Sequence, residues 1–185
     1  MLGTNRLLAY LHSWYPVYSS DVSMRELSKR GYMIPGGGIT TSFSAMAVAP
    51  AAVLSGGALD YTGGDFIYAF QGNTTTAFWR YSISGNSWAT MAIAPAIVAG
   101  GGALVHTGGD FIYAFQGGSN IAFWRYSISG NSWATMVDVP AGVSGGGALA
   151  YTGGDFIYAF SGGNYFWRTS LLPAPIFLGW QPWMR

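Results

Sequence analysis

The sequence is dominated by a repeat whose units are too short to bury a core of their own. A pentapeptide, Phe-Ile-Tyr-Ala-Phe, occurs three times, and consecutive copies begin 45 residues apart, at positions 66, 111 and 156. A longer string, FWRYSISGNSWATM, stands unchanged at 78–91 and 123–136. A period of roughly 20 to 50 residues is typical of folds in which each unit packs against its neighbours. The chain therefore divides into three units, 46–90, 91–135 and 136–170, and the last loses the pattern after Ser170.

Each unit predicts four short β-strands. The first unit has a glycine-led apolar run over 56–61, followed by strands rich in aromatic residues over 66–70 and 78–83, and a short strand over 87–90. The Gly-Gly pair at 63–64 suits a tight hairpin turn, because both central residues of such a turn need positive φ. Four strands in a repeat of this length are the pattern of a propeller blade. The predicted fold class is therefore all-β.

The glycines at the start of each unit have a predicted role in packing. Pairs stand at 56–57, 101–102 and 146–147, just before the first strand of each unit. In a propeller the first strand lies beside the central channel, where neighbouring backbones come close together. We expect these glycines to permit that approach.

The aromatic and glycine spacing resembles the kelch repeat. That motif has a glycine doublet after the second strand, then a tyrosine and a tryptophan separated by six residues. The second unit carries the whole motif, in Gly117, Gly118, Tyr126 and Trp133. The first unit keeps Tyr81 and Trp88 but has Gln-Gly at 71–72 in place of the doublet. The third unit has Gly162 and Gly163, but Thr169 replaces the tyrosine and no tryptophan follows at the expected place. The resemblance implies a kelch-type β-propeller.

Three blades form a partial, open propeller with two unpaired edges. Closed propellers have about four to eight blades, and open edges invite pairing with other chains. The chain is thus a fragment of a longer propeller, which we favour, or copies associate as a homo-oligomer that closes the ring. The segment 42–46, Ser-Phe-Ser-Ala-Met, aligns with 87–91 and predicts the tail end of an earlier blade. Residues 1–41 and 171–185 lie outside the repeat.

Composition excludes several classes of function. There is no cysteine, which removes disulfides, thiol catalysis and cysteine-ligated zinc. The formal charge of +1 gives no reason to expect a nucleic-acid partner, and no apolar run approaches the ~20 residues of a membrane span. We expect no cofactor and no metal site. The resemblance to bacterial and archaeal kelch-like proteins implies an extracellular or cell-surface location, while a cytoplasmic one stays open.

The candidate ligand contacts are aromatic and polar residues in the repeats. Trp79 and Trp124 are the aromatic residues that could stack on a sugar, although packing between blades accounts for most aromatic positions. The predicted loops 71–76 and 116–121 differ between otherwise near-identical units, which suits recognition. The candidate polar contacts in these loops are Gln71, Asn73, Gln116 and Asn120.

Charged residues in the repeats are expected to be structural. We predict that Arg80 pairs with Asp65, provided that Phe70 lies opposite Ala77 across the hairpin, and that Asp65 stabilises a turn. His106 stands where the other units have tyrosine, and a lone histidine there is not expected to be catalytic.

The predicted function is a non-catalytic module that binds a protein or glycan, or acts as a scaffold. One alternative is the propeller of a secreted enzyme, either galactose-oxidase-like or glycan-active. Two histidines, no cysteine and no nucleophile–base set argue against catalysis. The other alternative is a purely structural or adhesive surface repeat.

Overall fold

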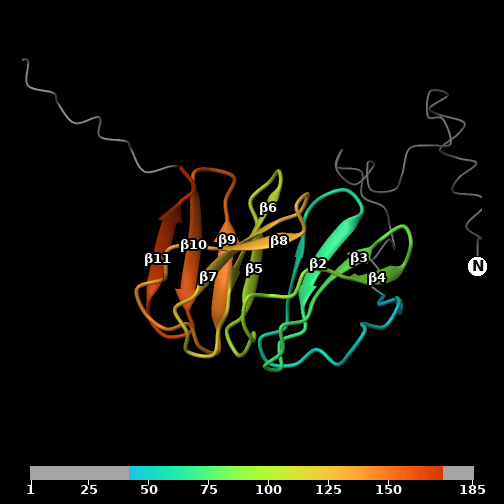
Figure 1. Cartoon of the computed structure of the whole chain (residues 1–185), viewed down its shortest axis with the longest axis horizontal. Helices are drawn as coiled ribbons and strands as arrows, with labels where there is room; N and C mark the ends of the chain where they lie inside the picture. Colours follow the sequence, from blue (N-terminus) through green and yellow to red (C-terminus); the bar gives the residue numbers. More distant parts are fainter. Residues whose placement is uncertain (1–41, 173–185) are drawn as a thin grey trace, which may run out of the picture. The chain divides into compact units, whose positions relative to one another are not determined.

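The computed structural model describes residues 42–172, and within them it contains three antiparallel sheets (Figure 1). The first sheet has the order β1-β2-β3-β4, the second β5-β6-β7-β8, and the third β11-β10-β9. The predictions for 1–41 and 173–185 lie outside the described residues. The strands are β1 (Ala58–Tyr61), β2 (Phe66–Phe70), β3 (Phe78–Ser82), β4 (Ser87–Thr90), β5 (Ala103–His106), β6 (Phe111–Phe115), β7 (Phe123–Ser127), β8 (Ser132–Thr135), β9 (Gly147–Tyr151), β10 (Phe156–Ser161) and β11 (Phe166–Ser170).

The strand positions predicted from the repeat are confirmed. Each sheet falls inside one predicted unit, and the third unit ends its pattern with the third strand, β11. Gly63 and Gly64 have φ of 86° and 61°, so the β1–β2 connection is the hairpin turn that the Gly-Gly pair predicts. No described residue belongs to a helix that is long and apolar enough to cross a membrane.

The register between β2 and β3 differs from our expectation by one residue. Phe70 lies opposite Phe78, and not opposite Ala77. The same register continues into the loop, where the backbone N–H of Gln71 donates to the carbonyl oxygen of Ala77 at 3.2 Å. A shift of one residue exchanges the faces on which side chains lie, and this decides the fate of Arg80 described below.

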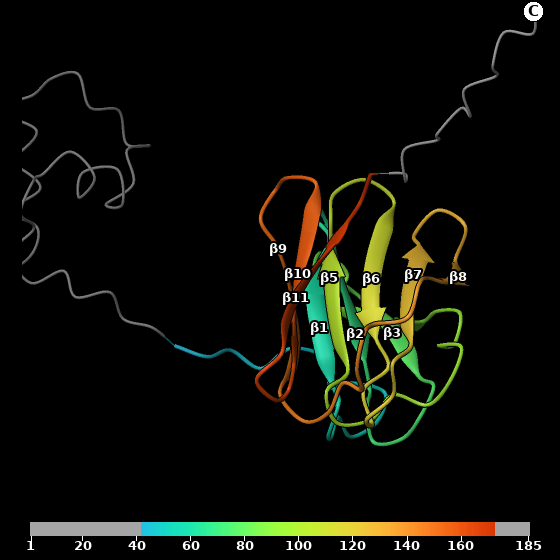
Figure 2. The same ribbon diagram turned by 90° about the vertical axis from the view of Figure 1, so that its left-hand side faces the viewer.

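The first strands of the three sheets lie beside one another. β1 contacts β5 and β5 contacts β9, and Figure 2 shows this side of the sheets. A Cβ atom on Gly56 would lie 2.0 Å from the carbonyl oxygen of Ala99, and one on Gly101 would lie 2.0 Å from that of Ser144. Both glycines also have positive φ. The prediction that they allow close approach of neighbouring backbones is confirmed.

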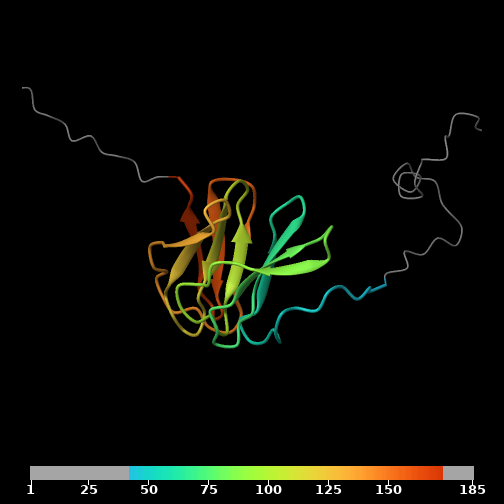
Figure 3. The same cartoon turned by 45° about the vertical axis from the view of Figure 1, so that its right-hand side comes forward.

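Aromatic side chains fill the spaces between neighbouring sheets, which follow one another in chain order (Figure 3). Tyr68, Phe70 and Phe78 of the first sheet pack against the second. Their counterparts in the second sheet, Phe115 and Phe123 among them, pack against the third. Full burial of such a side chain contributes about 1.5–3 kcal/mol. The aromatic repeat is therefore mainly the core, as expected.

Candidate functional site

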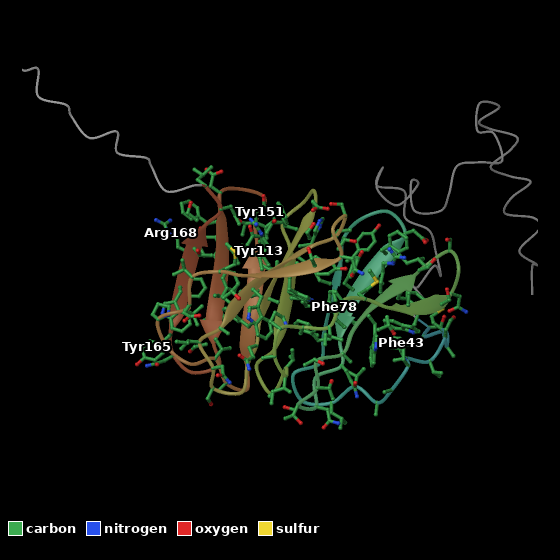
Figure 4. All side chains as sticks on the ribbon, in the orientation of Figure 1. Phe43, Phe78, Tyr113, Tyr151, Tyr165 and Arg168 are labelled. Atoms are coloured by element: carbon green, nitrogen blue, oxygen red, sulfur yellow. The ribbon has the colours of Figure 1, made fainter. Side chains whose placement is uncertain are left out.

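One end of the sheets carries all the loops that differ in sequence. In an antiparallel sheet alternate hairpins leave at opposite ends, so the β2–β3, β6–β7 and β10–β11 loops share one end. We call residues 73–76, 118–121 and 162–165 of these loops the variable-loop end. Tyr165 lies at this end of β11, whereas Arg168 lies toward the other (Figure 4).

The variable-loop end is held by bonds to the links between sheets. The backbone N–H of Thr74 donates to the carbonyl oxygen of Val98 at 2.9 Å, and that of Ser119 donates to Val143 at 2.7 Å. Single antiparallel bridges join Thr75 to Val98 and Asn120 to Val143. Each loop is thus fixed to the backbone that leads into the next sheet, and the two loops are held in the same way.

The backbone of these loops adopts conformations that side chains disfavour. Asn73 and Thr74 have φ of 54° and 56°, and Ser119 has φ of 64°. Positive φ is unusual for a β-branched residue such as threonine. Strained residues of this kind cluster at binding and catalytic sites. Asn86 and Asn131, in the turns at the other end, also have positive φ of 44°. Sequence variation together with exposed tips therefore makes the variable-loop end the candidate site.

The four predicted polar contacts separate into two groups. Asn73 and Asn120 are exposed at the loop tips, where a ligand can reach them. Gln71 is half-buried: its Nε2 donates to the carbonyl oxygen of Ala52 at 3.2 Å, and its Oε1 accepts from the Thr75 hydroxyl at 3.2 Å. Gln116 is buried. The two glutamines form the base of the loops, and their contact with a ligand stays a prediction, which burial disfavours for Gln116.

The proposal of tryptophan stacking platforms is wrong. Trp79 is 4% exposed and Trp124 is 2% exposed. Trp124 belongs to the core between the first two sheets, and its ring centre lies 6.2 Å from that of Trp133. A ring this deeply buried offers no face to a sugar. The alternation of the strand places both tryptophans on a covered face, and the sequence carries no signal of what covers it.

The kelch tyrosine and tryptophan hold the segment that leads into their own sheet. The indole N–H of Trp88 donates to the carbonyl oxygen of Ala47 at 3.0 Å, and the side-chain Oδ1 of Asn86 accepts from the backbone N–H of Ala47 at 2.8 Å. The hydroxyl of Tyr81 donates to the same Oδ1 at 2.7 Å. Three side chains therefore fix both polar groups of one residue, which supports their predicted structural role.

The second sheet repeats this clamp on Ala92. Trp133 donates to its carbonyl oxygen at 2.9 Å, and Asn131 accepts from its N–H at 2.9 Å. The role of the asparagines at 86 and 131 was not predicted from the sequence. Identity between the units does not single them out, because every residue of 77–91 recurs at 122–136.

The aspartates after the Gly-Gly turns stabilise the opposite end. Asp65 accepts from the Ser82 hydroxyl and from the backbone N–H of Ser84, both at 2.6 Å. Asp110 accepts from Ser127 and Ser129 in the same way, at 2.6 and 2.7 Å. These hydrogen bonds hold the pKa of both carboxyls below the ordinary value. The predicted turn-stabilising role is confirmed, although the turn is the β3–β4 turn.

The arginines lie over aromatic rings and, among the described residues, form no ion pair with the aspartates. The guanidinium carbon of Arg80 lies 4.2 Å from the ring centre of Phe66, and that of Arg125 lies 4.3 Å from Phe111. The observed register places Arg80 on the face of Tyr68, which is opposite the face that Asp65 would share with Ile67. The predicted Arg80–Asp65 pair is therefore wrong, and a cation–π contact replaces it.

His106 makes the turn contact that tyrosine makes in the first unit. Its Nε2 lies 3.1 Å from the carbonyl oxygen of Gly109, just as the Tyr61 hydroxyl lies 3.0 Å from that of Gly64. The backbone N–H of His106 donates to the Asp60 carboxylate. Burial raises the pKa of Asp60, although this hydrogen bond opposes the shift. Both residues are thus structural, and among residues 42–172 no three His, Cys, Asp or Glu side chains gather as a metal site would require.

Comparison with known proteins supports the fold. No protein-family model matches the chain, and no curated protein sequence matches it. Among solved structures, the chain resembles that of YjhT, a kelch-repeat propeller protein, with a TM-score of 0.53 and 18% sequence identity. The match covers 63% of this chain and 36% of the YjhT chain, so the chain spans only part of that protein's length. Together with the repeated sheets and the tyrosine–tryptophan clamp, it shows that the described residues have the kelch-type β-propeller fold.

Proposed function

We propose that this chain is a non-catalytic recognition or scaffold module that binds a glycan or protein surface through the variable-loop end. The observation that supports the proposal is where the repeats differ. Residues 73–76 read Asn-Thr-Thr-Thr where 118–121 read Gly-Ser-Asn-Ile, whereas 77–91 recur unchanged at 122–136. Variable loops on a constant frame are the usual arrangement of a binding surface.

The chemistry of these loops favours an uncharged, polar ligand. The tips present amide and hydroxyl groups and no charged side chain over 73–76, 118–121 and 162–165. Such groups donate and accept hydrogen bonds without the desolvation that a buried charge would require. Glycan hydroxyls and peptide backbone offer matching partners. An extracellular or cell-surface location, where glycans are abundant, is part of the proposal.

A loop exchange tests the proposal. A variant in which residues 73–76 become Gly-Ser-Asn-Ile should fold like the parent, because the second sheet already carries this loop on the same frame. We expect its binding profile on a glycan array, and to a panel of purified cell-surface proteins, to differ from that of the parent.

The matched control is Ser87→Ala, an exposed position at the first residue of β4. It should leave the profile unchanged. If the loop-exchange variant and the parent give the same binding profile, or if neither binds anything, recognition through these loops is refuted. The result would then favour the alternative of a purely structural repeat.

A further inference from the structure

Within residues 42–172, the third sheet has no counterpart of the fourth strand that completes the other two. β4 pairs with β3 in the first sheet and β8 pairs with β7 in the second. In the described residues β11 pairs only with β10, so one edge of its backbone is open. Open edges are sites at which another strand adds.

A hollow marks the place of the missing strand. In the second sheet, Trp133 of β8 packs against four rings, those of Phe70, Phe78, Trp124 and Tyr126. Their counterparts one unit further on line a hollow of about 310 Å³, and these counterparts are Phe115, Phe123, Trp167 and Thr169. The four neighbours of a fourth-strand aromatic ring are therefore in place, and no described residue supplies that ring.

The chain also contains a fourth-strand sequence without a sheet. Residues 42–45 read Ser-Phe-Ser-Ala. They stand 45 residues before β4, which reads Ser-Trp-Ala-Thr over 87–90. The following Met-Ala at 46–47 repeats at 91–92, and Ala47 sits in the same clamp as Ala92. Phe43 occupies the position of the tryptophan and is fully exposed. Residues 42–45 are not in a strand.

The exposed sheet faces match in the same way. Phe160 and Phe166 of the third sheet are 51% and 58% exposed, although their counterparts Phe70 and Phe78 are fully buried. Leu59 of the first sheet is 70% exposed. Its counterpart Leu104 in the second sheet packs against the first sheet and is only 7% exposed. The two open faces are thus the two halves of an interface that the molecule already forms between its first and second sheets.

These halves do not meet within one chain. β1 contacts β5, and β5 contacts β9, but β1 makes no contact with β9. The link after β4 leads directly into β5, the first strand of the second sheet, and that sheet lies against the first. Residues 42–45 can therefore occupy the edge of β11 only if the first sheet that follows them lies against the third sheet, which requires a first sheet from another molecule.

We propose that two copies of this chain associate head to tail, each giving residues 42–45 to β11 of the other, with Phe43 in the hollow beside Phe115 and Phe123. The first sheet of each copy then covers the third sheet of its partner. Two such contacts are related by a twofold axis and close the assembly. The resulting six sheets lie within the range of about four to eight found in closed propellers.

Light scattering during size exclusion of the whole chain tests the association. We expect twice the chain mass of 19.7 kDa. Phe43→Asp should give a monomer with unchanged circular dichroism, because residue 43 lies outside the sheets of its own chain. Ala134→Asp, at an exposed position of β8 in the second sheet, is the control and should remain dimeric, because the second sheet belongs to neither open face. A monomeric parent chain, or a dimer that Phe43→Asp leaves intact, would leave the hollow to residues 173–185 or to further repeats and overturn the proposal.

A disulfide designed from the register provides an independent readout. Ala89 lies opposite Arg80, so residue 44 should lie opposite Arg168 of the partner. Because the chain has no cysteine, the double variant Ser44→Cys with Arg168→Cys should form covalent dimers under oxidation. It should form no covalent species larger than the dimer. The control pair, Ser44→Cys with Arg125→Cys, should stay uncrosslinked, because β8 already occupies the edge of β7. Equal crosslinking of both pairs, or a ladder of polymers, refutes the closed dimer.

Discussion

Tyr68 and Tyr126 are neighbours between the first two sheets, but their hydroxyl groups have different surroundings. The ring centres lie 5.7 Å apart. The hydroxyl of Tyr126 donates to Asn131 Oδ1 at 2.7 Å, within the clamp that holds Ala92. The hydroxyl of Tyr68 is buried and has no hydrogen-bond partner among the described residues. A buried polar group without a partner loses its hydration and gains nothing in return.

We predict opposite effects when each of these two hydroxyls is removed. Tyr68→Phe should raise the free energy of unfolding by about 1–2 kcal/mol, because it removes an uncompensated desolvation. Tyr126→Phe is the matched control and should lower it by about 1–2 kcal/mol, because Asn131 loses a donor. Urea unfolding followed by tryptophan fluorescence measures both. Equal losses of stability in the two variants would mean that the Tyr68 hydroxyl has a partner.

At the scale of the elements, the links between sheets are as specific as the strands. The segments that lead into the first and second sheets each carry an alanine held by the clamp and, further on, a glycine that lies against the backbone of the segment leading into the next sheet. Gly101 and Gly108 have similar φ, 94° and 86°. A Cβ on Gly101 would collide with Ser144, whereas one on Gly108, in the hairpin turn, would have no atom within 4 Å. Comparing substitutions at Gly101 and Gly108 therefore distinguishes the cost of backbone strain from the cost of a collision between sheets.

We expect Gly101→Ala to be far more damaging than Gly108→Ala. The alanine at 108 adds only the strain of positive φ, about 1–2 kcal/mol. The alanine at 101 adds a collision with backbone that cannot move without separating the sheets, and should cost about 4 kcal/mol or more. Thermal unfolding by calorimetry measures the difference. Similar melting temperatures for the two variants would show that the links are not in close contact.

On the scale of the whole molecule, the second sheet differs from its neighbours because it is packed on both faces. One core cluster lies between it and the first sheet, and another lies between it and the third. In the part of the chain that the structure describes, the first and third sheets each leave one face open. In a repeat protein, stability comes largely from contacts between neighbouring units, so the middle unit is the most stabilised.

Hydrogen exchange should report this gradient. In a monomeric sample we predict the slowest backbone exchange in β6 and β7, and the fastest strand exchange in β11, which has an unpaired edge and an exposed face. Exchange measured by mass spectrometry with peptide resolution distinguishes the strands. Uniform protection across the three sheets would contradict a stability that depends on neighbouring units.

Much of the fold was determined by local sequence. The aromatic strands and the Gly-Gly turns each depend on a few neighbouring residues, and the period of 45 residues repeats them. Together these features predicted the strands, the hairpin at Gly63–Gly64 and the early end of the third sheet. Variation in the predicted loops 71–76 and 116–121 likewise indicated the candidate ligand contacts, which stay a prediction. These features are readable because a strand and a tight turn depend on the residues that form them.

Other features were decided only when distant segments met. The burial of Trp79 and Trp124, the hold of Asn86 on Ala47 and the contact of Arg80 with Phe66 all depend on which chain segment lies on each face of a sheet. Period-2 alternation shows that a strand has two faces but does not state what covers either one, and a single-residue change of register exchanges them. The repeat therefore determined the units, and the packing between units determined the role of each side chain.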